Sequence, residues 1–128
     1  MRVVDTSAWI EWILDSPLGI RLTRELPSNE EWVVPTLVQY ELARWLSREM
    51  SEAAASRLMA FSTELVVVPL TTDIATKAAD YAVLHKLAMA DAVIFATAKE
   101  TQADLLTCDA HFAELPGVIY FEKSRDDG

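Results

Sequence analysis

The chain has 128 residues, 52% of them hydrophobic, so it can bury the core of one compact domain and leaves little room for a second. A single cysteine, Cys108, excludes an intramolecular disulfide, and no apolar run is long enough for a signal peptide or a membrane span. The net charge of -9 argues against a general nucleic-acid-binding protein, which usually presents a basic face. We expect a cytoplasmic protein without a membrane partner, with one domain over residues 1–122 and a short acidic tail over residues 123–128.

The predicted elements alternate between strands and helices. In chain order they are a strand at 2–4, helices at 6–14 and 18–26, a strand at 32–34, helices at 37–50 and 51–62, a strand at 65–68, helices at 72–85 and 91–101, and strands at 105–108 and 118–121. This alternation predicts a single α/β domain with a parallel sheet of about four to five strands and helices on both faces.

Four acidic residues are placed at the ends of predicted strands or in the helices that follow them. Asp5 and Asp109 each follow a strand, Glu41 lies in the first turns of a helix, and Asp91 begins another. In open parallel sheets, ligand sites lie outside the carboxyl ends of the strands. The sequence therefore predicts that the four side chains gather at one rim of the sheet.

Carboxylates that converge without His or Cys partners favour Mg2+ or Mn2+ over zinc, because hard cations prefer oxygen ligands. A metal held in this way activates water and neutralises charge on a phosphodiester. We therefore take Asp5, Glu41, Asp91 and Asp109 as candidate ligands of Mg2+, with Mn2+ as the alternative, and as candidate catalytic residues.

Each acid also has an ordinary structural interpretation. Asp5 could cap the helix that follows it, and Glu41 could pair with Arg44 one turn further on. Asp91 would be stabilised by the dipole at the start of its helix, and Asp109 could cap a short turn. Taken singly these roles are the more common ones, but four uncompensated acids at one rim would repel one another, so their joint placement favours a shared cation.

Four segments resemble the motifs of PIN domains, and especially of the VapC toxins of bacterial and archaeal toxin–antitoxin pairs. VVDTSAW at residues 3–9 resembles the opening motif, and the glutamate of EL at residues 41–42 resembles the central one. DAVIFATA at residues 91–98 and TCDAHF at residues 107–112 resemble the third and fourth motifs. The resemblance covers nearly the whole chain, in the family's order.

This resemblance implies a metal-dependent endoribonuclease, often aimed at structured RNA such as transfer RNA, that forms a homodimer and is neutralised by a cognate VapB-like antitoxin. In it Thr6 and Thr107 flank the site, where their hydroxyls would orient carboxylates or a water, and Ser7 has a weaker claim to the same role. Two positions depart from the family pattern. His111 stands where many relatives carry a further acid, and Arg44 stands where many have a small residue.

Several other residues have both a functional and an ordinary interpretation. Arg44 and Arg48 share a helix face beyond Glu41, so they are candidate contacts for RNA phosphates or the antitoxin, the alternative being a solvated helix face. His111 could touch RNA or protonate a leaving group, or it could be structural. Most of the four tryptophans are expected in the core, although an exposed one could stack on a base or anchor an antitoxin helix.

Three other function classes compete with the nuclease. A phosphatase of the haloacid dehalogenase type needs a second aspartate two positions after the first, where this chain has Ser7. A magnesium-binding phospho-receiver would want an acidic pair after the first strand and a lysine late in the sheet, where this chain has one acid and Thr107. A catalytically weak PIN-like scaffold for RNA processing or binding would not need all four acids.

Overall fold

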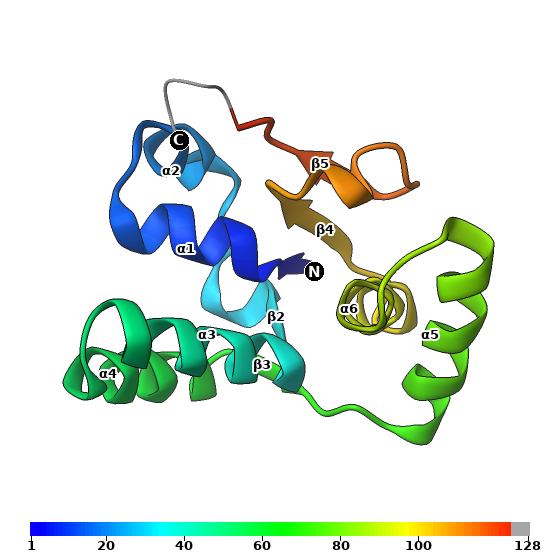
Figure 1. Ribbon diagram of the computed structural model, residues 1–128, viewed down its shortest axis with the longest axis horizontal. Coiled ribbons are helices and arrows are strands. Elements are labelled where there is room, and N and C mark those ends of the chain that lie inside the picture. The colour runs from blue at the N-terminus through cyan, green and yellow to red at the C-terminus, as the bar shows by residue number, and fades with distance from the viewer. Residues whose placement is uncertain (124–128) are drawn as a thin grey trace.

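The computed structural model describes residues 1–123, so the tail expected at 123–128 falls almost entirely outside the described residues. The strands are β1 (Arg2–Val4), β2 (Trp32–Pro35), β3 (Val66–Val68), β4 (Asp104–Thr107) and β5 (Val118–Tyr120). The helices are α1 (Thr6–Leu14), α2 (Pro17–Leu22), α3 (Thr36–Glu49), α4 (Glu52–Thr63), α5 (Thr72–His85) and α6 (Met89–Glu100), with three short 3₁₀ turns at Thr23–Glu25, Asn29–Glu31 and Ala110–Phe112. Figure 1 shows these elements in chain order.

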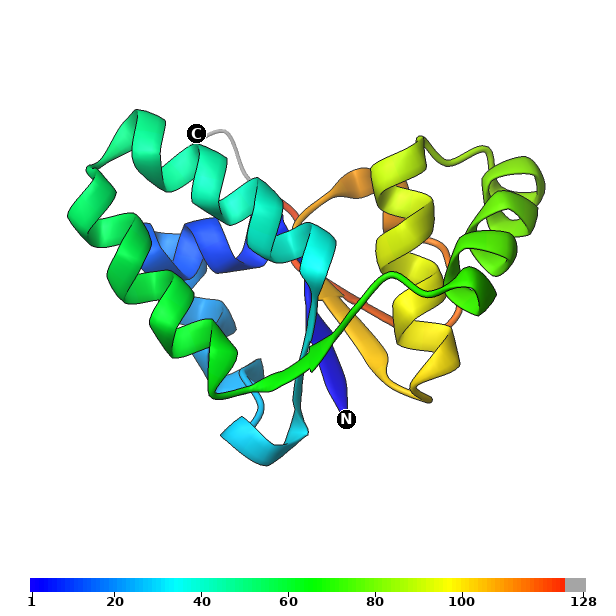
Figure 2. The same cartoon turned by 90° about the horizontal axis from the view of Figure 1, so that it is seen from below.

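All five strands are parallel and form one sheet in the order β3-β2-β1-β4-β5. Right-handed crossovers place the connections from β1 to β3 on one face of such a sheet and the return connection to β4 on the other. Accordingly, α1 to α4 cover one face and α5 and α6 cover the opposite face (Figure 2). The predicted α/β fold with a parallel sheet and helices on both faces is confirmed.

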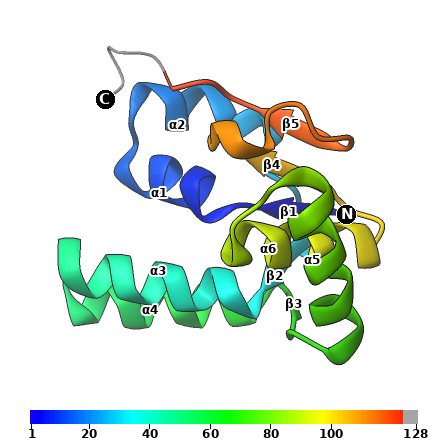
Figure 3. The ribbon, with the colours of Figure 1, turned by 45° about the vertical axis from the view of Figure 1, so that its right-hand side comes forward.

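The strand order reverses between β1 and β4, the two central neighbours of the sheet. Val4 lies beside Leu106 in their register, and the chain continues into α1 after β1 and into the short turn Ala110–Phe112 after β4. In open α/β sheets a crevice forms outside the carboxyl ends of strands at such a reversal. Figure 3 shows the start of α1 and the turn after β4 diverging from this point.

Helix α6 is apolar on nearly all sides, because it packs against both the sheet and α5. Every residue from 92 to 98 is buried. Its predicted start at Asp91 is wrong by two residues: the helix begins at Met89 after Ala88, and Asp91 lies in its first turn. The buried helix therefore holds Asp91 on a rigid support beside the strand ends.

Two further boundaries differ slightly from the predicted ones. The strand expected at 105–108 is shifted to Asp104–Thr107, so Cys108 separates it from Asp109. The helix expected at 18–26 divides into α2 and the turn Thr23–Glu25. Among the described residues, no single helix is long and apolar enough to cross a membrane, and α5 and α6 meet that test only as a pair bent by 115°.

Three of the four tryptophans form an aromatic cluster with Phe61. Ring centroids of Trp9, Trp12, Trp32 and Phe61 lie 4.8 to 6.1 Å apart in six pairs. Trp9 is fully buried and Trp32 is 3% exposed. The core role predicted for most tryptophans is therefore confirmed for these rings, which join α1 to β2 and α4.

Gly19 allows α2 to pack directly on the backbone of α1. A Cβ at this position would lie 2.6 Å from the carbonyl carbon of Glu11 and closer still to its oxygen. We expect Gly19→Ala to lower the free energy of unfolding by about 3 kcal/mol, because overpacking against backbone cannot be relieved by rotating a side chain. Urea denaturation monitored by circular dichroism measures the change.

Gly117→Ala provides the matched control. Gly117 has a φ of 80°, and an added Cβ would meet only the flexible end of Lys99 at 3.1 Å. The strain of a left-handed residue should cost about 1 kcal/mol. A Gly19→Ala protein that is as stable as the Gly117→Ala protein would contradict the close approach of α2 to α1.

Candidate functional site

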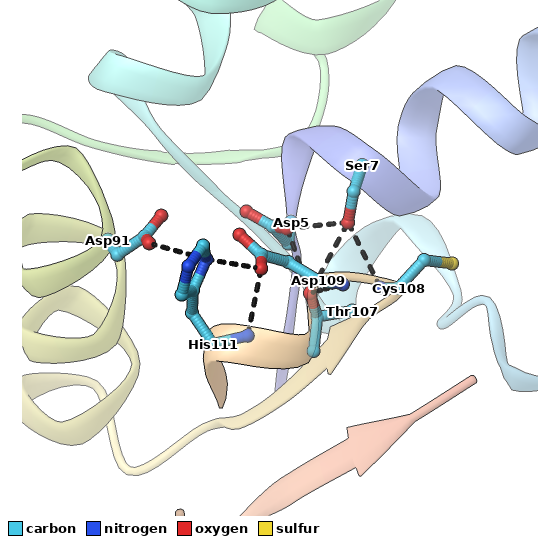
Figure 4. Close-up of polar contacts among 7 residues, drawn as sticks. All are labelled: Asp5, Ser7, Asp91, Thr107, Cys108, Asp109 and His111. Carbon is cyan, nitrogen blue, oxygen red and sulfur yellow. Dashed lines mark hydrogen bonds and ion pairs between the residues drawn. The ribbon is translucent and has the colours of Figure 1, made fainter. Parts of the chain in front are cut away.

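The carboxylate of Asp5 is buried at the point where β1 ends, with the residue only 4% exposed. Its backbone N–H donates a hydrogen bond of 2.8 Å to the carbonyl of Leu106 in β4. Its Oδ2 accepts hydrogen bonds from Ser7 Oγ at 2.6 Å and Thr107 Oγ1 at 2.9 Å (Figure 4). Asp5 precedes α1, yet its side chain makes no capping bond to that helix. The carboxylate is thus held by the hydroxyls of two other segments.

The same two hydroxyls connect the ends of β1 and β4. Ser7 Oγ accepts a hydrogen bond from the Cys108 N–H at 3.0 Å and lies 3.3 Å from Thr107 Oγ1. Thr107 Oγ1 accepts from the Asp109 N–H at 2.9 Å. Ser7 therefore binds the carboxylate of Asp5 directly, although the family resemblance indicated a weaker role for it than for Thr6 and Thr107.

Glu41 reaches the site from the first turns of α3. Thr6 Oγ1 donates a hydrogen bond of 2.6 Å to Glu41 Oε1. The alternative pairing with Arg44 does not form: Arg44 instead donates to the hydroxyl of Tyr40 at 3.3 Å. The two threonines expected to flank the site thus each bind a different carboxylate, Thr6 that of Glu41 and Thr107 that of Asp5.

Asp91 and Asp109 lie on either side of the imidazole of His111, as Figure 4 shows. The Nδ1 atom of His111 is 2.8 Å from Asp109 Oδ1 and 3.8 Å from Asp91 Oδ2. Asp109 Oδ1 also accepts the backbone N–H of His111 at 2.9 Å, so Asp109 caps the short turn Ala110–Phe112 as its ordinary interpretation required. This capping leaves Asp109 within the acidic cluster.

The acids affect one another electrostatically. Burial raises the pKa of Asp5, and the charges of Asp109 and Glu41 raise it further against the hydrogen bonds from Ser7 and Thr107. The charges of Glu41 and Asp109 are therefore close enough to Asp5 to disfavour its ionised form.

The charges of the other three acids also act on Asp91. Burial is the main cause that raises the pKa of Asp91 to about 6, followed by the charges of Asp109, Asp5 and Glu41, with His111 acting in the opposite direction. All four acids predicted to share a rim therefore lie together at the reversal of the strand order.

The donor atoms of this cluster fit a divalent cation. One ligand atom each from Asp91, Asp109 and His111 lies within 4.8 Å of the others; Asp5 and Glu41 are not in this group, but their charges act on Asp91. Carboxylate oxygens are the ligands that Mg2+ and Mn2+ prefer. A cation here would offset the burial and the neighbouring negative charges that raise the pKa values of Asp5 and Asp91.

Two hollows lie on this part of the surface: one includes Asp109 in its lining, and the other follows α3 beyond Glu41. One, of about 530 Å³, is lined by Ser7, Cys108, Asp109, Ala110, Tyr120, Glu122 and Lys123. The other lies along α3 and is lined by Tyr40, Ala43, Arg44, Ser47 and Arg48. Both arginines of α3 are exposed, and Arg48 also pairs with Glu49 at 3.0 Å.

The family model of the PIN domain matches residues 2–118 of this chain. The chain belongs to the PIN domain family. The resemblance seen in the four sequence motifs is thereby confirmed, and the acidic cluster described above contains one acid from each motif.

Solved structures with the same fold include toxins of VapBC type. A toxin–antitoxin complex from Klebsiella pneumoniae is similar with a TM-score of 0.83 and 21% identity, covering 96% of this chain and 100% of that one. VapC20 of Mycobacterium tuberculosis, described as a toxin cleaving the sarcin-ricin loop, is similar with a TM-score of 0.74 and 22% identity. This match covers 92% of this chain and 97% of that one. FitAcB from Neisseria gonorrhoeae is similar with a TM-score of 0.73 and 21% identity, covering 95% of this chain and 97% of that one. Comparison with curated proteins gives no match.

The raised pKa of Asp91 predicts how the stability of this PIN domain depends on pH. The folded value of about 6 lies above the ordinary 3.8, so the ionised carboxylate destabilises the folded state above pH 6, and the penalty fades as the pH falls from 6 to 4. In metal-free protein at pH 8, Asp91→Asn should therefore increase the free energy of unfolding, by about 1 to 2 kcal/mol once screening by water is allowed for.

Thermal melts between pH 4.5 and 8 measure this effect. The advantage of Asp91→Asn should shrink toward zero at the acidic end, where the parent carboxyl is protonated. Asp73→Asn is the matched control, because Asp73 is an exposed acid in the first turn of α5. If Asp91→Asn melts no higher than the parent at pH 8, the raised pKa of Asp91 and its two causes, burial and the neighbouring carboxylates, are wrong.

Proposed function

We propose that this PIN domain is a metal-dependent endoribonuclease that hydrolyses RNA phosphodiester bonds, and that it is the toxin of a toxin–antitoxin module. The observation that carries the proposal is the joint placement of four mutually repelling acids at the switch point between β1 and β4. Membership of the PIN domain family supports nuclease chemistry. Similarity in fold to toxin–antitoxin complexes, and to a toxin described as cleaving the sarcin-ricin loop, supports the biological role.

In this proposal Asp5, Glu41, Asp91 and Asp109 are the catalytic residues and hold Mg2+, or Mn2+ in its place. A divalent cation at such a site supplies activation of water and neutralisation of charge on the phosphodiester. RNA carries one negative charge for each phosphate, and the chain has a net charge of -9, so neutralising the four acids is a condition for the substrate to approach.

Hydroxyl groups keep the carboxylates in place during this reaction. Ser7 and Thr107 hold Asp5 by its Oδ2 atom, and Thr6 holds Glu41 by its Oε1 atom. Hydrogen bonds of this kind fix the direction of a ligand and prevent it from turning away when its charge is neutralised. The bonds given to Asp5 also lower the cost of ionising a carboxylate that is almost completely buried.

Arg44 and Arg48 remain our proposed contacts for RNA phosphates or for an antitoxin, because both are exposed one and two turns beyond Glu41. The homodimer implied by the resemblance also remains a proposal. Exposed apolar side chains where α5 meets α6 support it: Val83 is 83%, Leu84 70% and Met89 76% exposed.

The phospho-receiver alternative finds less support in the geometry. Such a site needs an acidic pair after the first strand, whereas the neighbours of Asp5 are the hydroxyls of Ser7 and Thr107. A catalytically weak PIN-like scaffold would have the same fold and site as an active ribonuclease and would differ only in its rate of RNA cleavage. A cleavage assay therefore distinguishes these two hypotheses.

The parent protein should cleave RNA with Mg2+ or Mn2+ and lose activity in EDTA. Attack by water should leave a 5′-phosphate and a 3′-hydroxyl. Asp91→Asn should reduce cleavage by more than about 100-fold, because changes to residues that merely orient metal ligands already cost about 10- to 100-fold. Gel analysis of labelled RNA, with identification of the product ends, measures both.

Asp73→Asn again serves as the control and should keep parental activity, since Asp73 lies exposed on α5. Mg2+ should also raise the melting temperature of the parent more than that of Asp91→Asn, because a cation that binds only the folded state stabilises it by mass action. Undiminished cleavage in EDTA, or a 2′,3′-cyclic phosphate product, would refute the metal mechanism.

The toxin role predicts a small protein partner and a growth phenotype. Expression of the parent without its partner should stop growth, whereas expression of Asp91→Asn should not. Tagged protein from the native host should co-purify with an antitoxin that blocks cleavage, through apolar anchors and an Arg or Lys that enters the acidic cluster. Recovery of the chain alone, combined with harmless expression of the parent, would count against the toxin role.

A further inference from the structure

His111 is held in the acidic cluster by the turn that Asp109 caps. The turn Ala110–Phe112 is anchored by Phe112, which is fully buried, while the imidazole of His111 is 76% exposed. Asp109 Oδ1 accepts the backbone N–H of His111 and lies 2.8 Å from its Nδ1 atom. The ring therefore has a defined position between Asp91 and Asp109 without being part of the core.

The spacing of the atoms suits ligands around a single cation. Neighbouring ligands of an octahedral ion with bonds near 2.1 Å lie about 3 Å apart. The Nδ1 atom of His111 is 2.8 Å from Asp109 Oδ1 and 3.8 Å from Asp91 Oδ2, and the three ligand atoms all lie within 4.8 Å of one another. Ligation through Nδ1 replaces the hydrogen bond between this atom and Asp109 Oδ1, with the proton of the neutral ring on Nε2.

The chain contains only one other histidine, His85, and its ring is engaged elsewhere. His85 stacks on Tyr81 with ring centroids 6.0 Å apart and meets Phe95 edge-on at 5.5 Å. His111 is therefore the histidine whose nitrogen faces the carboxylates.

We propose that His111 ligates the cation through Nδ1, beside Asp91 and Asp109, and gives this site a preference for Mn2+ over Mg2+. The inference rests on the proposed metal site and changes its expected donor set, because the sequence indicated carboxylates alone. Mg2+ strongly favours oxygen ligands, whereas imidazole nitrogen suits transition metals. Replacing one oxygen donor by nitrogen therefore weakens Mg2+ binding relative to Mn2+ binding.

Pulsed electron paramagnetic resonance of the full chain loaded with Mn2+ tests the ligation directly. A nitrogen nucleus bound to Mn2+ produces a hyperfine coupling that oxygen ligands do not. Because the chain has two histidines, two variants assign the signal. The parent and His85→Ala should both show the nitrogen coupling, and His111→Ala should lose it while still binding Mn2+ through the carboxylates.

Titration with Mn2+ and Mg2+ tests the preference. His111→Asp places an oxygen donor at this position, so the ratio of Mg2+ to Mn2+ dissociation constants should fall below that of the parent. Circular dichroism melts of the variants check that they fold, and His111→Asp provides a second test if His111→Ala does not.

The outcomes separate this inference from the proposed function. Mn2+ bound to the parent without a nitrogen coupling, or an unchanged metal preference in His111→Asp, would overturn the role of His111 and leave the nuclease intact. Failure of the parent to bind Mn2+ at all would overturn both. A coupling lost in His85→Ala instead of His111→Ala would also refute the proposal.

Discussion

The arrangement of the site depends on one buried carboxylate. Asp5 directly follows β1, its backbone N–H is bonded to the Leu106 carbonyl of β4, and one of its carboxylate oxygens accepts two hydrogen bonds from hydroxyls. A buried acid without such partners would be strongly destabilising. Thr107 and Ser7 therefore have two roles: they donate hydrogen bonds to Asp5, and they hold together the ends of the two parallel strands at which the strand order reverses. The remaining acids are arranged around this fixed group.

Rigid supports keep the repelling acids close. Asp91 lies in the first turn of a helix whose next seven residues are all buried, and Asp109 caps a turn anchored by the buried Phe112. Neither side chain can move its backbone away from the other without disrupting the core. Hydrophobic packing thus provides the free energy that keeps like charges together, as is common at functional sites.

Much of the fold follows from local patterns, whereas the detailed contacts do not. Apolar spacing and proline breaks predict the five strands, and the alternation of strands with helices predicts their parallel arrangement. The sequence predicts a start of α6 at Asp91, two residues late, because Ala88 offers no capping side chain that would mark the true start. The approach of His111 to Asp91 depends on how α6 packs beside the turn after β4, and nothing within either segment shows it. The preference of Arg44 for Tyr40 over Glu41 is similarly a choice among rotamers.

The strand order also determines when the site can first exist. Asp5 and Thr107, which share a hydrogen bond, are separated by 102 positions in the chain. At synthesis rates of about 5 to 20 residues per second, roughly 5 to 20 s pass between the incorporation of the two residues. Until β4 has been made and has paired with β1, Asp5 lacks Thr107 and the cluster lacks Asp109. A ribosome-bound chain that is still missing β4 therefore has no complete acidic cluster, and the cell has that interval before a newly made molecule can assemble one.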